Sequence, residues 1–216
     1  MGGVIGLKNL IIIGAGGYAK SVIDSIDKHV FHIYGFIDDY KTDKFHLGYP
    51  ILGKNIKCIK NSNNFFYFIA IGDNEKRLNW YKKLKKNNLE LVNIIDKSAI
   101  ISNHAKIGEG CFVGKMAIIN SKAKIGDNCI INTRALIEHG CTIGNNVNIS
   151  TNSVLNGDVK VGDSAFIGSC SVVNGQLSIG QNVIVGSGSV VISNIENNCT
   201  VVGIPAKVIK KDGKRI

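Results

Sequence analysis

His139 is the residue whose type and setting best fit proton-transfer chemistry. It follows Glu138 and precedes Gly140, at a position that the in-out alternation of the surrounding short strands directs outward. A histidine side chain ordinarily has a pKa of about 6.5, so its neutral form can remove a proton from a hydroxyl group near neutral pH. His139 is therefore a candidate general base and Glu138 a candidate partner, although an exposed histidine in such a pattern is more often inert.

Gly157 is a second candidate for the same reaction. It lies in the segment Asn156-Gly157-Asp158, where a glycine corner can present a bare backbone N–H to a developing oxyanion. The alternative is an ordinary turn residue. No Ser-His-Asp arrangement and no nucleophilic cysteine is visible, which favours direct transfer without a covalent enzyme intermediate.

A glycine-rich turn follows the first apolar run. Residues 7–13 predict a strand, Gly14-Ala15-Gly16-Gly17-Tyr18-Ala19 a turn, 21–28 a helix and 31–37 a second strand ending in Asp38-Asp39. This order is typical of a dinucleotide-binding βαβ unit. We expect a loop at 50–53, a strand at 65–71, a helix at 75–86 and a strand at 91–95. Such a unit can hold a mononucleotide or a sugar but is small for a dehydrogenase. NAD chemistry and a turn needed only for packing remain alternatives.

A six-residue repeat occupies the second half of the chain. A branched aliphatic residue recurs at every sixth position from Ile95 to Val185, and the run extends to about Val190. This period predicts a parallel β-helix of about five triangular coils. Small residues fill one slot of most hexads, and three of the six cysteines, Cys111, Cys129 and Cys141, occupy such slots. After Val190 we expect the period to fail and a tail to cap the last coil.

These patterns divide the chain into a small α/β domain, residues 1–94, and a β-helix domain, residues 95–216. Because no loop interrupts the repeat, the coils form no deep cleft of their own. We therefore expect an active site in a groove between neighbouring subunits of a cyclic homo-oligomer, completed by the N-terminal domain.

Composition excludes several functions. The net charge is +10, but the lysines are spread along the chain, so we predict no nucleic-acid binding. Lys207 and the basic residues after it form a short tail that is either solvated or receives an anionic ligand. The cysteines have no metal-ligand spacing, which predicts buried thiols, no metal and a reducing compartment. No apolar run is long enough to span a membrane, so we expect a cytoplasmic protein.

The hexads and the tail Val201-Val202-Gly203-Ile204-Pro205-Ala206-Lys207 resemble those of the hexapeptide acyltransferases. With the glycine-rich turn, the chain is similar to the PglD-like sugar N-acetyltransferases and, more closely, to the NeuD sialic acid O-acetyltransferases. The NeuD resemblance rests on long blocks: Gly14 to Gly17 with Lys20-Ser21, Gly35 to Asp38, Tyr49 to Gly53, Asn93 to Lys97, Ile131 to Arg134, Leu136 to Gly140, Asn148 to Asn152 and Val173 to Leu177.

The resemblance implies a fold, a cofactor and a set of site residues. It implies a Rossmann-like α/β domain followed by a left-handed parallel β-helix, assembled as a homotrimer that uses acetyl-CoA as co-substrate. It assigns His139 as the base and Gly157 as the oxyanion donor. The implied acceptor-binding residues are Gly16, Gly17, Tyr18, Asp38, Asp39 and Gly72, and the implied acetyl-CoA residues are Asn148, Ser169, Ser187 and Lys207.

Three departures from the N-acetyltransferase pattern favour a hydroxyl acceptor. Gly140 replaces an acid beside the base, and Asn148 and Tyr18 each replace a histidine. We therefore predict O-acetylation of sialic acid in bacterial surface-polysaccharide synthesis. The alternatives are N-acetylation of a nucleotide-linked 4-amino sugar, and a non-catalytic partner that stabilises other sialic acid enzymes.

Overall fold

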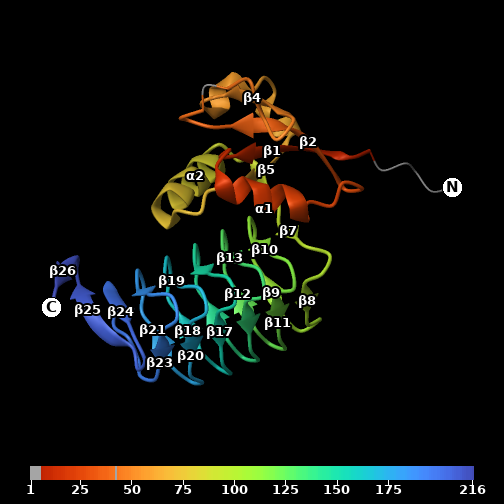
Figure 1. Cartoon of the computed structure of the whole chain (residues 1–216). Coiled ribbons are helices and arrows are strands. Elements are labelled where there is room, and N and C mark those ends of the chain that lie inside the picture. Colours follow the sequence, from red (N-terminus) through yellow and green to blue (C-terminus); the bar gives the residue numbers. More distant parts are fainter. Residues whose placement is uncertain (1–5, 42) are drawn as a thin grey trace. The chain divides into compact units, whose positions relative to one another are not determined.

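The computed structural model describes residues 6–41 and 43–216, which form two compact units (Figure 1). The first unit is Met1–Ile94 and the second is Ile95–Ile216. No helix in the described part of the chain is both long and apolar enough to cross a membrane.

The first unit is built on a sheet with the strand order β3-β4-β2-β1-β5-β6, in which only β3 and β4 pair antiparallel. Its elements are β1 (Lys8–Ile13), α1 (Gly17–Ser25), β2 (Phe31–Ile37), β3 (Phe45–His46), β4 (Tyr49–Gly53), two 3₁₀ turns (Ile56–Cys58 and Ser62–Asn64), β5 (Phe66–Ile69), α2 (Asn74–Lys86) and β6 (Glu90–Leu91). Four successive aliphatic residues of β1, Leu10 to Ile13, are fully buried, as expected for a central parallel strand. Strands β2 and β5 pair with opposite edges of β1. The strand order therefore reverses at the carboxyl end of β1, which is where open α/β sheets bind ligands.

Three expectations for this unit were wrong in detail. The first helix begins at Gly17, directly after the turn, and ends before Ile26, which has an extended backbone. The expected loop at 50–53 is part of strand β4, which pairs with β2 and β3. The expected strand at 91–95 is two strands, because β6 joins this sheet whereas β7 (Ile94–Ile95) joins a sheet of the β-helix.

The second unit is a left-handed parallel β-helix whose strands stack into three sheets over the described residues. One sheet contains β7, β10 (Phe112–Val113), β13 (Ile130–Ile131), β16 (Asn148–Ile149), β19 (Phe166–Ile167), β22 (Ile184–Val185), β24 (Cys199–Val202), β25 (Lys207–Lys211) and β26 (Lys214–Arg215). A second contains β8 (Ile100–Ile101), β11 (Ile118–Ile119), β14 (Leu136–Ile137), β17 (Val154–Leu155), β20 (Val172–Val173) and β23 (Val190–Val191). The third contains β9 (Lys106–Ile107), β12 (Lys124–Ile125), β15 (Thr142–Ile143), β18 (Lys160–Val161) and β21 (Ser178–Ile179). The predicted fold class is thus confirmed.

Each coil places residues 18 positions apart directly over one another, as in the pairing of Ile101 with Ile119 and of Ile119 with Ile137. From β10 to β23, the second residue of each two-residue strand points inward, and these residues build a continuous aliphatic core. Many corners contain a residue with positive φ, such as Asn128, Asn146 and Asn152. Asparagine tolerates this left-handed backbone better than most residues, which explains its frequency in the repeat.

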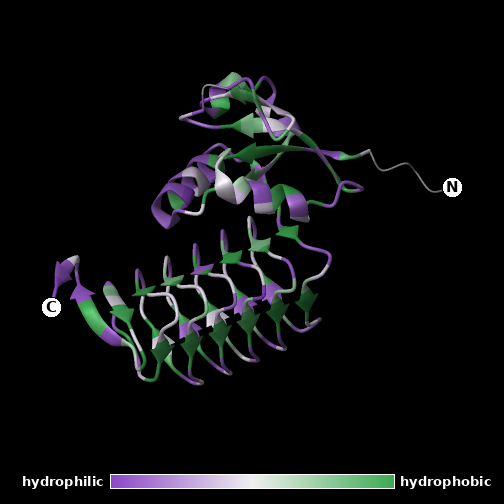
Figure 2. Cartoon of the chain, in the orientation of Figure 1, coloured by the Kyte–Doolittle hydropathy of each residue, from purple (hydrophilic) through white to green (hydrophobic). Residues whose placement is uncertain are grey.

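The outward sides of two of the sheets differ in chemistry. The sheet of β8 carries only aliphatic residues, which we name the apolar face: Ile100, Ile118, Leu136, Val154, Val172 and Val190. The sheet of β9 carries polar residues, which we name the polar face: Lys106, Lys124, Thr142, Lys160 and Ser178. Figure 2 shows this contrast between the green strands β8, β11, β17 and β20 and the purple strands β9 and β12.

The repeat continues beyond the expected end at Val190. Strand β24 pairs in parallel with β22, and Ile195 forms an isolated parallel bridge with Ile179. Ile195, Cys199 and Val201 are buried in the core of the β-helix. The segment between Val191 and Cys199 is irregular and breaks the six-residue period. The last coil therefore could not be predicted from that period. The antiparallel strands β25 and β26 then cover the edge of β24.

Candidate active site

His139 lies at the corner between β14 and β15, where the apolar face meets the polar face. Its side chain is exposed. The carboxylate of Glu138 accepts a hydrogen bond from the backbone N–H of His139 at 3.2 Å. In this conformation Glu138 therefore fixes the backbone of the corner rather than the imidazole ring.

Gly157 lies in the next coil, 18 residues after His139, and the imidazole packs onto it. An ideal Cβ added to Gly157 would lie 2.6 Å from Cε1 and 2.7 Å from Nε2 of His139. The two corners are also joined by the backbone N–H of Asp158, which donates to the carbonyl of His139 at 2.9 Å. Within the described residues the N–H of Gly157 donates to no acceptor. A histidine nitrogen and a free backbone N–H thus lie side by side at the surface.

Asp158 occupies the position at which a side chain on Gly140 would begin. A Cβ added to Gly140 would collide with Oδ1 of Asp158, and Gly140 has a φ of +70°. The corner of the proposed base therefore contains a carboxylate, although residue 140 is a glycine. Sequence reasoning missed this role of Asp158. The signal for it was the spacing of 18 residues, which stacks Asp158 over Gly140.

Cys141 follows this corner but is unsuited to act as a nucleophile. Its side chain is buried, and the thiol lies 3.2 Å from the carbonyl oxygen of Asn156, to which it donates. Burial raises the pKa of Cys141, and the negative charges of Asp158 and Glu138 raise it further. Because the thiolate is the nucleophilic form, this thiol is inert near neutral pH.

The residues predicted to bind acetyl-CoA lie elsewhere on the β-helix. Ser169 and Ser187 stack at the corners that precede β20 and β23, where the carbonyl of Ser169 accepts the N–H of Gly188 at 2.8 Å. Lys207 is exposed at the start of β25. Asn148 is only 6% exposed, and its Oδ1 accepts a hydrogen bond from Ser150 at 3.4 Å. Within one chain, His139 and the two serines lie on opposite edges of the apolar face.

The first unit contains a cavity of about 370 Å³ at the carboxyl ends of β1, β2 and β5. All six residues predicted to bind the acceptor line it: Gly16, Gly17, Tyr18, Asp38, Asp39 and Gly72. A Cβ added to Gly16 or Gly17 would meet nothing within 4 Å, so the surface above both glycines is open. The first N–H groups of α1 begin here, and such groups favour anions.

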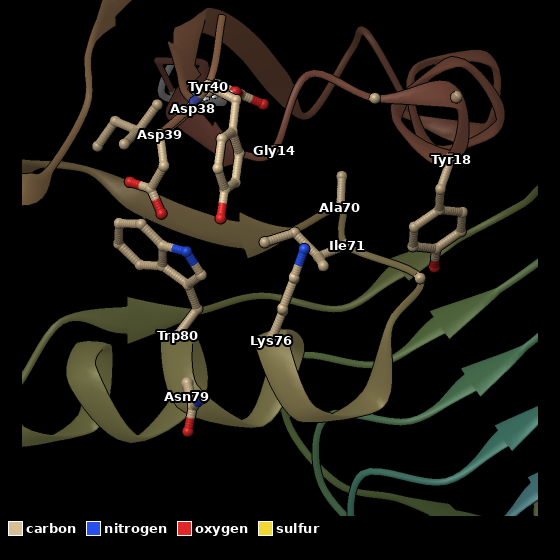
Figure 3. Close-up of a pocket in the computed structure, with 14 residues that line it drawn as sticks. Gly14, Tyr18, Asp38, Asp39, Tyr40, Ala70, Ile71, Lys76, Asn79 and Trp80 are labelled. Carbon is tan, nitrogen blue, oxygen red and sulfur yellow. Dashed lines mark hydrogen bonds between the residues drawn. The ribbon is translucent and has the colours of Figure 1, made fainter.

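The cavity is also lined by polar and aromatic side chains that were not predicted from the sequence: Tyr40, Lys76, Asn79 and Trp80. Figure 3 shows the side chains of Asp39, Tyr40, Trp80 and Lys76 directed into the same space. The Nζ atom of Lys76 lies 5.4 Å from the centre of the Tyr40 ring. The cavity thus combines aromatic rings, which stack on nucleobases, with a cation and a helix N-terminus, which suit phosphate, and with the exposed carboxylate of Asp39.

Asp38 organises this cavity through its backbone contacts. Its Oδ2 accepts the N–H of Ala15 at 2.7 Å, and its Oδ1 accepts the N–H groups of Tyr40 at 2.9 Å and Lys41 at 2.8 Å. Burial alone would raise the pKa of Asp38, but these hydrogen bonds outweigh burial and hold the pKa below its usual value. The carboxylate therefore ties the glycine-rich turn to the loop after β2.

We expect Asp38→Asn to destabilise the first unit by about 1–2 kcal/mol at pH 7, because it weakens hydrogen bonds to a charged acceptor that water partly reaches. The folded-state pKa is depressed, so this contribution is present above the unfolded pKa of about 3.9 and is lost as the pH falls through the folded value. Urea unfolding of wild type and variant at pH 7 and pH 3 measures the difference. A difference that does not shrink at pH 3 would contradict this account.

Metal ligation finds no support in the described residues, because no three His, Cys, Asp or Glu side chains are grouped suitably. Cys58, Cys111, Cys129, Cys141, Cys170 and Cys199 are all free thiols.

Two domain families match consecutive parts of the chain. Residues 9–84 match the PglD N-terminal domain, and residues 90–174 match the GMPPB C-terminal domain. Among curated proteins, protein L142 of Acanthamoeba polyphaga mimivirus is 38% identical over 105 residues. That match covers 48% of this chain but only 20% of the viral protein, so the chain spans about a fifth of that relative.

Several solved structures match nearly the whole chain. PerB from Caulobacter crescentus, solved with CoA and GDP-perosamine, is 35% identical with a TM-score of 0.85, over 94% of this chain and 97% of PerB. The acetyltransferase domain of PglB from Neisseria gonorrhoeae is 28% identical with a TM-score of 0.88, over 93% and 99% of the two chains. WeeI from Acinetobacter baumannii is 28% identical with a TM-score of 0.84, over 93% and 99%.

The fold and the two candidate sites define a class, the hexapeptide-repeat β-helix proteins that carry an N-terminal Rossmann-like domain. Within this class, the chain belongs to the PglD-like sugar acetyltransferases.

Proposed function

We propose that this protein transfers the acetyl group of acetyl-CoA to the amino group of a nucleotide-linked amino sugar. The cavity of the first unit carries the proposal, because Tyr40, Trp80, Lys76 and the start of α1 suit a nucleobase and phosphate rather than a free sugar. The relationship to PerB, which was solved with CoA and GDP-perosamine, supports the same substrate class.

His139 is the proposed general base. The nitrogen of the neutral acceptor amine attacks the thioester carbonyl carbon of acetyl-CoA, and the imidazole takes a proton from this nitrogen as the C–N bond forms. The N–H of Gly157 donates to the carbonyl oxygen as it becomes negative. The C–S bond then breaks, and the leaving sulfur takes the proton from His139. Two structures of variants of the Caulobacter enzyme replace a single histidine, which agrees with a central role for such a residue.

Asp158 is the acid that we propose to influence the base. Its carboxylate fills the space beside Gly140, next to His139 in the chain, and no hydrogen bond joins it to the imidazole in the described structure. An acid thus lies at the corner of the proposed base even though residue 140 is a glycine. The glycine at 140 therefore argues less strongly against an amine acceptor than the sequence alone did.

The two edges of the apolar face support a site shared by neighbouring copies. His139 borders one edge, and Ser169 and Ser187 lie at the other. If copies pack through their apolar faces in a cyclic arrangement, the His139 edge of one chain meets the serine edge of the next. We propose a homotrimer in which acetyl-CoA binds at this junction, as predicted from the sequence.

We expect the wild type to sediment at three times the 23.3 kDa of one chain. Val154→Glu buries a charge in the apolar face and should give single chains that keep their far-ultraviolet circular dichroism. Ser178→Glu adds the same charge to the polar face and should remain trimeric. Sedimentation of the wild type as a single chain would contradict the proposed assembly.

O-acetylation of sialic acid is the second candidate. The motif blocks that resemble the NeuD enzymes favour it, as do Gly140, Asn148 and Tyr18 at positions where the N-acetyltransferase pattern differs. In this case His139 would remove a proton from a sugar hydroxyl instead of an amine, with the same role for Gly157.

An acceptor panel separates these functions. Thiol release from acetyl-CoA is followed with a nucleotide-linked 4-amino sugar, the matching nucleotide-linked sugar with a 4-hydroxyl group, and free sialic acid. We expect turnover with the amino sugar only. Turnover with sialic acid alone would establish the second candidate, and no turnover with any acceptor would favour a non-catalytic partner of other enzymes.

A further inference from the structure

A basic groove lies on the polar face beside the corner of His139. The groove has a volume of about 390 Å³ and is lined by His104, Lys106, Lys122, Lys124, Gly140 and Thr142. These residues come from three successive coils, at the strands β9, β12 and β15 and the corners before them. Gly140 directly follows His139, so the groove begins at the proposed base.

The lysines of the groove are stacked on one another. Lys106 and Lys124 are register partners on β9 and β12, so their side chains leave the sheet next to each other. His104 and Lys122 are likewise 18 residues apart in consecutive corners. Like charges directly opposite one another on a sheet destabilise it. This arrangement therefore costs stability unless the groove holds an anion.

Acidic side chains do not neutralise this cluster. In the described residues, Lys106, Lys122 and Lys124 are exposed and form no salt bridge. Two acids lie near Gly140: Asp158, whose carboxylate lies over it, and Glu138, which accepts the N–H of His139. Both belong to the corner at one end of the groove, whereas the lysines extend away from it over the preceding coils.

We propose that this groove binds a phosphate group of a substrate, with Lys122 and Lys124 as the main contacts. Three lysines around one cavity suit a multiply charged anion better than a single carboxylate. Assignment to a substrate rests on the proposed function, in which both the nucleotide-linked sugar and acetyl-CoA carry phosphates. Phosphate binding itself does not depend on that function.

Titration calorimetry of the full chain with inorganic pyrophosphate at low ionic strength tests the groove. We expect the double variant Lys122→Ala/Lys124→Ala to bind about 100-fold more weakly, at about tenfold for each lost charge-assisted contact. Added salt should weaken binding to the wild type. Lys160→Ala is the matched control, because Lys160 lies on the same face but does not line the groove. Equal losses in the control and the double variant, or no loss in the double variant, would overturn the proposal.

Steady-state kinetics of the same variants identify the source of the phosphate. If the acceptor supplies it, the KM for the nucleotide-linked sugar rises about tenfold or more and the KM for acetyl-CoA stays constant; if acetyl-CoA supplies it, the reverse holds. If the double variant is active and both KM values are unchanged, neither substrate places a phosphate in the groove, and the proposal is overturned. Absence of turnover in the wild type would reject the proposed function. The pyrophosphate titration would still test whether the groove binds phosphate.

Discussion

His139→Ala should lower kcat/KM by about 10²- to 10⁴-fold, the range for loss of a positioned general base. Its side chain is exposed at a corner, so the β-helix core is untouched and thermal stability should change little. Acetyl-CoA binding should also persist, because its proposed contacts include Ser169 and Ser187 of the neighbouring chain and do not include the imidazole. Thiol-release kinetics and calorimetric titration of acetyl-CoA measure the two effects separately.

His32→Ala is the control for this prediction. His32 is exposed on β2 of the first unit and lines no candidate site. We expect wild-type kinetics for this variant. Wild-type kcat/KM in His139→Ala would remove the proposed base and, with it, the mechanism.

Gly157→Ala should lower kcat/KM by about 10²-fold, although it keeps the backbone N–H that stabilises the oxyanion. The added methyl group would lie within 2.7 Å of Cε1 and Nε2 of His139, closer than atoms can approach. Because His139 is exposed, we expect its ring to swing away while the coil stays intact. A displacement of about 1 Å at a reacting group can cost about 10²-fold in rate.

Gly6→Ala is the matched control for Gly157→Ala, because a Cβ at Gly6 would meet nothing within 4 Å. The two variants should have similar melting temperatures, and only Gly157→Ala should lose activity. Undiminished activity in Gly157→Ala would mean that the position of the imidazole over Gly157 is irrelevant to turnover.

The repeat could be read from the sequence because its period is rigid. Inward aliphatic residues recur every six positions, and each coil adds one more layer to the same core. The same periodicity contains the contact between Asp158 and Gly140, since residues 18 apart stack. The prediction used the six-residue period along the chain but not the stacking of residues in successive coils. It therefore missed Asp158. The last coil escaped detection because its corner, between Val191 and Cys199, breaks the period.

The cavity of the first unit was predictable only in part. The glycine-rich turn and Asp38 follow strand ends that the pattern reveals, so their place at the carboxyl edge of a parallel sheet follows from general rules. Lys76 and Trp80 line the cavity only because β5 pairs beside β1 and α2 follows β5. Strand order is set by tertiary packing, which no local pattern encodes. The predicted acceptor-binding residue Asp38 does line the cavity, but the pattern did not reveal that both its oxygens accept backbone N–H groups.

The central claim is that His139 drives acetyl transfer to a sugar nitrogen. Tandem mass spectrometry of the product formed from acetyl-CoA and a nucleotide-linked 4-amino sugar tests it most directly, with wild type and His139→Ala in parallel. We predict one added acetyl group on the sugar nitrogen with the wild type, and a yield lower by at least about 10²-fold with the variant. An acetyl group on a hydroxyl, or equal yields from both proteins, would contradict the account.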